Sequence, residues 1–211
     1  MARAYDSSGR ERAAARTRER IVATARELLL HGGYAQMRVT DLAKAAEVSP
    51  QTIYNAIGGK AEVVKAVYDV MLAGDADETP MSERPEFLRL TAAGTIDEFA
   101  AAYAGWTRGI QERVGPLLGV LLEHGAAGDP ILEGLVQKMN TERRQGNTNA
   151  LNRLSQRVEL PDGAARTRLI DAMWTLTGPA VYDDLVGRCN WSSGDYEQWL
   201  AAQLSTALRA R

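Results

Sequence analysis

The sequence has little of what marks a secreted, membrane-spanning or disulfide-linked protein. It contains one cysteine, Cys189, and no apolar run long enough to cross a membrane. A single cysteine excludes an internal disulfide framework and favours a reducing compartment. The basic, polar N-terminus also lacks the apolar core of a secretion signal. We therefore expect a cytoplasmic protein that has no membrane partner.

Residue types that build catalytic and metal centres are also scarce. The two histidines, His31 and His124, are far apart, and no Cys/His/Asp cluster has metal-ligand spacing. The Gly58-Gly59-Lys60 triplet lacks the strand and the spacing of a phosphate-binding loop. Adjacent Asp183 and Asp184 do not converge on one substrate from a helix. We predict no enzyme activity, no metal and no cofactor.

The charge of the chain is unevenly distributed. The net charge is −2, but residues 1–60 carry ten Lys/Arg against six Asp/Glu, a local +4. Residues 61–211 carry fifteen against twenty-one, a local −6. Binding to phosphates needs local cations and not a basic whole. The N-terminal part is therefore expected to face a polyanion, with the acidic remainder facing away.

Two short helices joined by a tight turn are predicted within Val39–Lys60. Thr40 is a candidate N-cap for the first helix, with Asp41 in its first turn. Ser49 is a candidate N-cap for the second, and Pro50 suits its first helical position. This layout is typical of a helix-turn-helix, which places its second helix in the DNA major groove.

The second of these helices has an apolar and a polar face. Ile53 and Ile57 are expected to point inward. The outer face is expected to carry side chains that can hydrogen-bond bases or phosphates, namely Gln51, Thr52, Tyr54 and Asn55. Lys60 opens the next helix, where a cation opposes the helix dipole unless a phosphate lies nearby. Simple solvation of this lysine is the alternative.

Helical periodicity continues through the rest of the chain. Residues 1–15 lack periodicity and are expected to form a flexible basic arm, followed by a helix from Thr17 to Gly32-Gly33. Further helices are predicted over 60–73, 96–115, 117–126, 130–158, 163–187 and 195–210, the fifth of them kinked at Gly178-Pro179. We predict an all-α protein of about nine helices, with a helix-turn-helix domain over 16–73, a linker over 74–86 and a second helical domain over 87–211.

In this order of elements the chain resembles a TetR/AcrR-family transcriptional regulator. The resemblance rests on the "VS" turn, the "TIY" recognition helix and the lysine that opens the fourth helix, within about residues 16–68. It continues more loosely in "WTLTGPAVYDDLV" and "WSSGDYEQWLAAQL" near the C-terminus. Two positions depart from the family pattern: Glu47 stands where the turn commonly has glycine, and Ile57 where an aromatic residue is usual.

The resemblance implies a regulator, more often a repressor, that binds a palindromic operator in double-stranded DNA. Members of the family act as homodimers and are usually released by a small-molecule effector. With the flanking arginines and caps, the predicted DNA-binding residues are Arg16, Arg18, Arg38, Thr40, Ser49, Pro50, Gln51, Thr52, Tyr54, Asn55 and Lys60. A helical ligand-binding module or an enzyme, neither of them binding DNA, is the alternative function.

The resemblance also implies roles for the second domain. Its last two helices are expected to join two copies through a stripe made by Trp174, Val181, Leu185, Tyr196, Trp199, Leu200, Gln203, Leu204 and Leu208. An effector site is expected among Tyr103, Trp106, Leu118, Leu121, His124, Met139, Trp174 and Thr177, which offer an apolar lining with a few polar groups. For both sets, ordinary packing inside one chain is the alternative.

Overall fold

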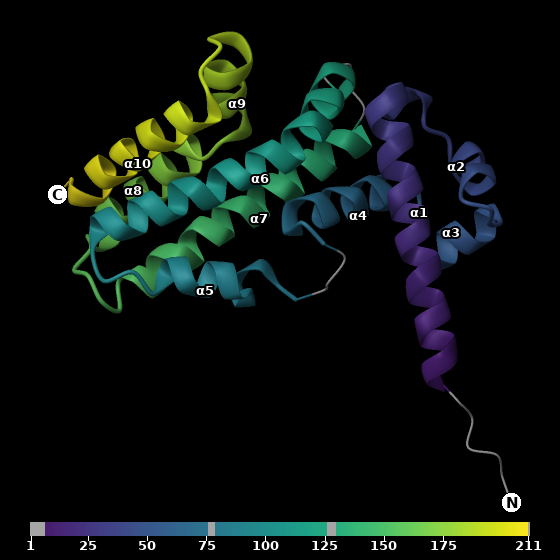
Figure 1. Cartoon of the computed structure of the whole chain (residues 1–211), viewed down its shortest axis with the longest axis horizontal. Helices are drawn as coiled ribbons and strands as arrows, with labels where there is room; N and C mark the ends of the chain where they lie inside the picture. Colours follow the sequence, from purple (N-terminus) through teal and green to yellow (C-terminus); the bar gives the residue numbers. More distant parts are fainter. Residues whose placement is uncertain (1–6, 76–78, 126–129, 211) are drawn as a thin grey trace, which may run out of the picture. The chain divides into compact units, whose positions relative to one another are not determined.

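The structure is a computed structural model that describes residues 7–75, 79–125 and 130–210, with side chains over 9–75, 79–121 and 130–210 (Figure 1). Every regular element within these ranges is helical, which confirms the predicted all-α class. The chain divides into two compact units. The first comprises Met1–Ala76 with Pro116–Leu135, and the second comprises Asp77–Gly115 with Val136–Arg211.

The first helix, α1 (Ser7–Gln36), begins ten residues earlier than the sequence pattern predicted. The expected arm is therefore helical over residues 7–15, while residues 1–6 lie outside the described part. Alanine and arginine are strong helix formers, and an exposed helix needs no apolar periodicity to form. The predicted end of the helix is confirmed, because Gly33 has a left-handed φ of 75° that interrupts the helical path.

Three further helices of the first unit pack around α1. They are α2 (Val39–Ala45), α3 (Pro50–Ala56) and α4 (Lys60–Ala73), and α2 and α3 also contact each other. The apolar side chains between them are fully buried and include Ile21, Leu29, Leu42, Ile53 and Val67. The short helices α2 and α3 are each too short to be stable alone, so this core holds them in place.

The second unit contains the remaining helical segments of the chain. In order they are η1 (Met81–Glu83), α5 (Pro85–Thr91), parts of α6 (Ile96–Gly125) and α7 (Pro130–Leu154), α8 (Gly163–Leu176), α9 (Pro179–Tyr182), the π-helical η2 (Asp183–Arg188) and α10 (Ser193–Arg209). Aromatic and aliphatic side chains form its core, among them Phe87, Phe99, Leu151, Met173 and Tyr196. Among the described helices, none combines the length and the apolar composition that a membrane crossing needs.

Two prolines account for two differences between the predicted and the observed helices. The predicted break at Gly115-Pro116 is absent, and α6 runs through Pro116 as one helix. An internal proline removes one backbone hydrogen bond and bends a helix, but a long helix can absorb that loss. Conversely, Pro85 begins α5 at the edge of the expected linker, at the first helical position that proline favours.

The predicted kink at Gly178-Pro179 is instead a complete break. Helix α8 ends at Leu176, Gly178 is extended with a ψ of 143°, and Pro179 begins the four-residue helix α9. Proline disfavours the helical conformation of the residue before it, which accounts for the break. A Cβ atom at Gly178 would also lie 2.9 Å from the Thr175 carbonyl oxygen, so this buried position requires glycine.

Candidate nucleic-acid interface

The turn between α2 and α3 is closed by backbone hydrogen bonds. The Val48 amide donates to the Ala43 carbonyl at 3.0 Å, and the Glu47 amide to the Lys44 carbonyl at 3.3 Å. This is the Schellman pattern, in which the residue after the helix is left-handed. Glu47 has a φ of 53°, so it adopts the conformation that glycine adopts without strain. The departure from the family pattern therefore changes the residue but keeps the turn.

The caps of the two short helices differ in how well the sequence predicted them. Ser49 caps α3, because its Oγ accepts the Thr52 amide at 3.0 Å, and Pro50 takes the first helical position as predicted. The predicted N-cap of α2 is wrong. Arg38 occupies that position and makes no side-chain cap bond, while Thr40 is an exposed residue of the first turn beside Asp41.

Helix α3 presents a polar face to solvent and an apolar residue to the core. Gln51, Tyr54 and Asn55 are exposed, Tyr54 by 53%, whereas Ile53 is fully buried. The Gln51 Nε2 donates to Asn55 Oδ1 at 2.8 Å. Thr52 is half-buried, and its hydroxyl lies 2.8 Å from the Ser49 hydroxyl. The predicted orientation of the helix is therefore confirmed.

Arg18 has a partner inside the protein. Its Nη1 donates to the Ala56 carbonyl at 3.3 Å, at the C-terminal end of α3. The last carbonyls of a helix have no partner within it, and a cation there also complements the helix dipole. Arg18 thus joins α1 to the recognition helix, a contact across thirty-eight residues that the local sequence could not reveal.

Lys60 also has a partner that the sequence did not indicate. Its ammonium lies over the ring of Tyr34, 3.9 Å from the centroid, at the start of α4. The sequence did not reveal this cation–π contact, and the phosphate contact of Lys60 stays a prediction. It holds the ammonium beside the α4 N-terminus, where Gly59 supplies no side-chain cap.

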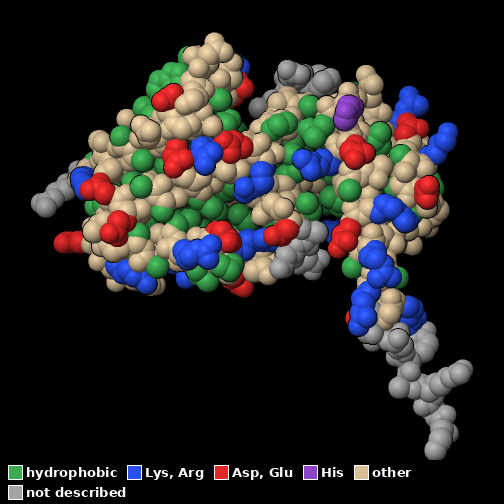
Figure 2. All heavy atoms as spheres, in the orientation of Figure 1, with side chains coloured by type: hydrophobic (Ala, Val, Ile, Leu, Met, Phe, Trp, Pro, Cys, Tyr) green, Lys and Arg blue, Asp and Glu red, His purple; other side chains and the backbone are tan. Residues whose placement is uncertain are grey.

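Exposed arginines extend along α1. Arg10, Arg12, Arg16, Arg20 and Arg26 are all exposed, and Figure 2 shows Lys and Arg side chains along this helix. Arg38, before α2, is exposed as well. The first unit therefore carries cations on the helix that contacts α3, as phosphate binding requires.

The predicted dimer stripe separates into buried and partly exposed residues. Four of its members are core residues of the single chain, at most 2% exposed, and so are not available at a surface: Tyr196, Leu200, Leu204 and Leu208. The correction follows from their packing on the second unit's own core. The partly exposed members are Trp174, Val181, Leu185, Trp199 and Gln203.

The predicted effector set is also divided. Leu118 and Leu121 belong to the first unit, and the side chain of His124 lies outside the described residues. The members in the second unit are Tyr103, Trp106, Met139, Trp174 and Thr177. Trp106 is partly buried against Phe87 and Tyr103, with ring centroids 5.5 and 5.4 Å away, and Met139 is buried.

A buried polar network surrounds Thr177, which the prediction had placed in the effector set. The Tyr103 hydroxyl donates to Asn147 Oδ1 at 2.6 Å, and the Asn147 Nδ2 donates to Thr177 Oγ1 at 3.3 Å. The Gln111 Nε2 donates to the Thr177 carbonyl at 2.9 Å. Asn147 lies in a polar stretch of α7, yet it is only 3% exposed.

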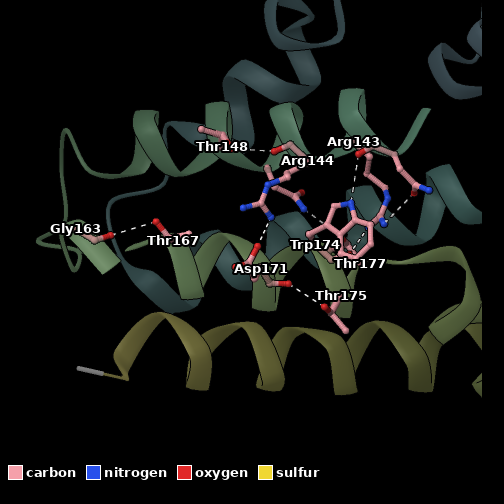
Figure 3. A network of polar contacts seen from close by, with 11 residues as sticks. Arg143, Arg144, Thr148, Gly163, Thr167, Asp171, Trp174, Thr175 and Thr177 are labelled. Carbon is pink, nitrogen blue, oxygen red and sulfur yellow. Dashed lines mark hydrogen bonds and ion pairs between the residues drawn. The ribbon is translucent and has the colours of Figure 1, made fainter. Parts of the chain in front are cut away.

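The neighbouring Trp174 is held by contacts from two residues of α7 (Figure 3). The Arg143 guanidinium lies 4.4 Å from the centre of its ring and donates to the Trp174 carbonyl. The indole Nε1 donates to the Asn140 carbonyl at 3.3 Å. These contacts hold the end of α8 against α7 just before the break at Gly178.

No group of three metal-ligating side chains occurs among the residues that the structure describes.

Comparison with known proteins gives matches of two kinds. The family model described as "Bacterial regulatory proteins, tetR family" matches residues 21–67, which run from α1 into α4. A solved Clostridium perfringens protein, described as a regulator of fatty acid metabolism, has the same fold at 12% sequence identity and a TM-score of 0.51. That alignment covers 91% of this chain and all of the other. No curated protein matches the sequence. Residues 21–67 therefore match the DNA-binding domain of the tetR family, and this match supports a TetR-family transcriptional regulator.

Proposed function

We propose that this regulator is a cytoplasmic repressor that binds a palindromic operator as a homodimer and is released by a small-molecule effector. The observation that carries the proposal is the exposed face of α3, which presents Gln51, Tyr54 and Asn55 while Ile53 anchors the helix in the core. Side chains of these types, on the second helix of a helix-turn-helix, can read base edges and phosphates.

The residues of this face have different roles in the proposal. The carboxamides of Gln51 and Asn55 can donate to and accept from adenine in the major groove, so they specify sequence. The Tyr54 hydroxyl and the Lys60 ammonium bind phosphates, and the amides at the start of α4 add donors to the same anion. Arg16 and Arg38 supply further phosphate contacts from exposed positions.

A homodimer is proposed because one helix-turn-helix reads only half of a palindrome. Its contact face is formed by the partly exposed residues near the C-terminus, Val181, Leu185, Trp199 and Gln203. Trp191, which is 36% exposed and packs edge-on against Trp199, extends this apolar surface. Truncation after Val186 removes α10, so dimers that persist on sedimentation of the truncated chain would contradict this assignment.

The proposal is tested by a gel-shift titration with DNA from upstream of the chain's own gene and of its neighbours. Gln51→Ala is expected to change base preference, whereas Tyr54→Phe and Lys60→Ala weaken binding to all fragments alike. Glu133→Ala, an exposed change outside α1–α4, serves as the control and leaves affinity unchanged. Absence of salt-sensitive, sequence-specific binding to any fragment favours the rival functions, a helical ligand-binding module or an enzyme.

A further inference from the structure

Two polar atoms in the second unit are buried without a partner. Within the part of the chain that the structure describes, the buried side-chain atoms left without a hydrogen bond are Gln111 Oε1 and Tyr196 Oη. Gln111 is 3% exposed and Tyr196 is 0% exposed. Buried polar groups are almost always paired, because an unpaired one loses its water and gains nothing in return. Each exception therefore needs a physical explanation.

Both atoms belong to residues that contact the same interruption of the helical path. Gln111, on α6, donates its Nε2 to the Thr177 carbonyl directly before the break. Tyr196, on α10, meets the ring of Tyr182 edge-on at 4.9 Å, at the end of α9. The two residues that carry the unpaired atoms thus contact Thr177–Tyr182 from two different helices.

The orientation of the Gln111 carboxamide is determined by its partner. A carbonyl oxygen can only accept, so the atom facing the Thr177 carbonyl must be the NH₂ group. The atom that is left is then the oxygen, which needs a donor. The Tyr196 hydroxyl is a donor that needs an acceptor, since burial raises the pKa of Tyr196 well above its usual range and keeps it protonated.

Four other polar side chains near the break have hydrogen-bond partners. Tyr103, Asn147 and Thr177 are linked in one chain of hydrogen bonds, and Arg143 donates to the Trp174 carbonyl. The Arg143 Nη1 would also lie 3.9 Å from a Cβ atom at Gly178. A guanidinium and a hydrogen-bonded network thus border the break, and the buried side-chain atoms without a partner among the described residues are one acceptor and one donor.

We propose that Gln111 and Tyr196 are the hydrogen-bonding groups of an effector site at the α8–α9 break, and that the effector contains a neutral carboxamide or lactam. The proposal rests on the proposed ligand-released function and specifies its ligand. A carboxamide carries an N–H for Gln111 Oε1 and a carbonyl for the Tyr196 hydroxyl. A charged ligand would lose its hydration in a site whose polar residues are this deeply buried, so a neutral group fits better.

The segment that contacts Tyr196 is irregular. Helix α9 has four residues, and η2 that follows it is π-helical, a form frequently found at functional sites. Tyr182 and Trp199 are both partly exposed and both contact the Tyr196 ring, so they connect it with the surface. Movement of Thr177–Arg188 would admit a ligand and shift α10, which contacts η2.

The test uses two matched probes on the full-length protein. Saturation-transfer NMR is recorded with 2-pyrrolidinone, which has a lactam N–H and C=O, and with N-methyl-2-pyrrolidinone, which lacks the N–H. We expect 2-pyrrolidinone to bind at least about tenfold more tightly, and Gln111→Met and Tyr196→Phe each to weaken it by about tenfold. Equal binding of the two probes, or unchanged binding in both variants, overturns the proposal.

A second measurement does not depend on any probe. Because Tyr196→Phe removes an unpaired hydroxyl and keeps the ring, it should raise the melting temperature of the ligand-free protein. Val181→Ala, a truncation of a partly exposed residue nearby, serves as the control and should lower it. A lower melting temperature for Tyr196→Phe would mean that the hydroxyl is already satisfied by an ordered water, and would overturn the proposal.

The outcome for this site and the outcome for the proposed function are separable. Both variants lie outside the helix-turn-helix, so their operator binding in a gel shift shows that they are folded. Failure of the probe with operator binding intact overturns the site and leaves the DNA-binding proposal standing. Binding of the probe without loss of operator affinity supports the site and overturns its link to release.

Discussion

Two arginines on α1 allow the proposed DNA contact to be tested separately from the positioning of α3. Arg16 is exposed, whereas Arg18 is half-buried and donates to the Ala56 carbonyl at the end of α3. We predict that Arg18→Met weakens operator binding by displacing α3, and that Arg16→Met weakens it by removing a phosphate contact. The two changes delete the same charge two residues apart, so each is the control for the other.

The expected magnitudes differ in kind. A hydrogen bond from a charged group contributes about 1.5–3 kcal/mol when buried, and partial exposure of Arg18 reduces this to about 1 kcal/mol. If the whole loss is transmitted to α3, affinity falls about fivefold for each bound helix-turn-helix. Arg16→Met instead changes the salt dependence, because each lost phosphate contact lowers the slope of log K against log salt by about 0.9.

The assay is fluorescence anisotropy of a labelled operator at several salt concentrations, with each variant titrated in parallel. We predict an unchanged salt slope for Arg18→Met and a smaller slope for Arg16→Met. Hydrogen exchange of the Ile57 and Gly58 amides should also be faster in Arg18→Met but not in Arg16→Met. The hydrogen bond from Arg18 to the Ala56 carbonyl holds the end of α3 directly beside these amides. A reduced salt slope in Arg18→Met with unchanged exchange would refute the positioning role.

Three further predictions concern stability. Glu47→Gly should stabilise the first unit by about 0.5 kcal/mol in urea unfolding. Glycine removes the strain energy of the left-handed backbone at this position, which slightly exceeds the entropy that glycine adds to the unfolded chain. A clear loss of stability would show that Glu47 is not strained. Gly178→Ala should cost about 1–3 kcal/mol, since its Cβ would meet the Thr175 carbonyl oxygen, and an unchanged melting temperature would show that the break can relax. Hydrogen bonds from Ser205 and Arg209 lower the pKa of Asp97 below its ordinary value of 3.8. The stabilisation is therefore present above that pH and lost below it, so Asp97→Asn should be less stable than the parent at pH 7 and equal to it in acid.

Features encoded by neighbouring residues were predicted well from the sequence. The cap at Ser49, the proline at position 50 and the end of α1 at Gly33 each depend on one or two side chains and their backbone preferences. The inward position of Ile53 follows in the same way from helical spacing. Local chemistry was therefore sufficient to define the second helix of the helix-turn-helix and its exposed face, although it placed the N-cap of α2 at Thr40 and not at Arg38.

Features that depend on distant partners could not be predicted. In a sequence, a glutamine or asparagine within a helix looks like a solvent-facing residue. No residue near Gln111 or Asn147 in the sequence indicates that both will form hydrogen bonds with Thr177. The partner of Arg18 lies on another helix for the same reason. Amphipathic spacing placed Tyr196 on an apolar stripe but could not tell a dimer surface from the chain's own core.

The hydrogen bond between Gln51 and Asn55 has a consequence for how the protein searches DNA. Both carboxamides already have a partner in the free protein, so reading a base exchanges one hydrogen bond for others. On a mismatched sequence the two side chains can keep their mutual bond, and the complex leaves neither of them unpaired. Under the proposed function, non-cognate DNA would then be tolerated and could be scanned. The correct base pair would gain only the difference in free energy between its two new contacts and the one hydrogen bond that they replace.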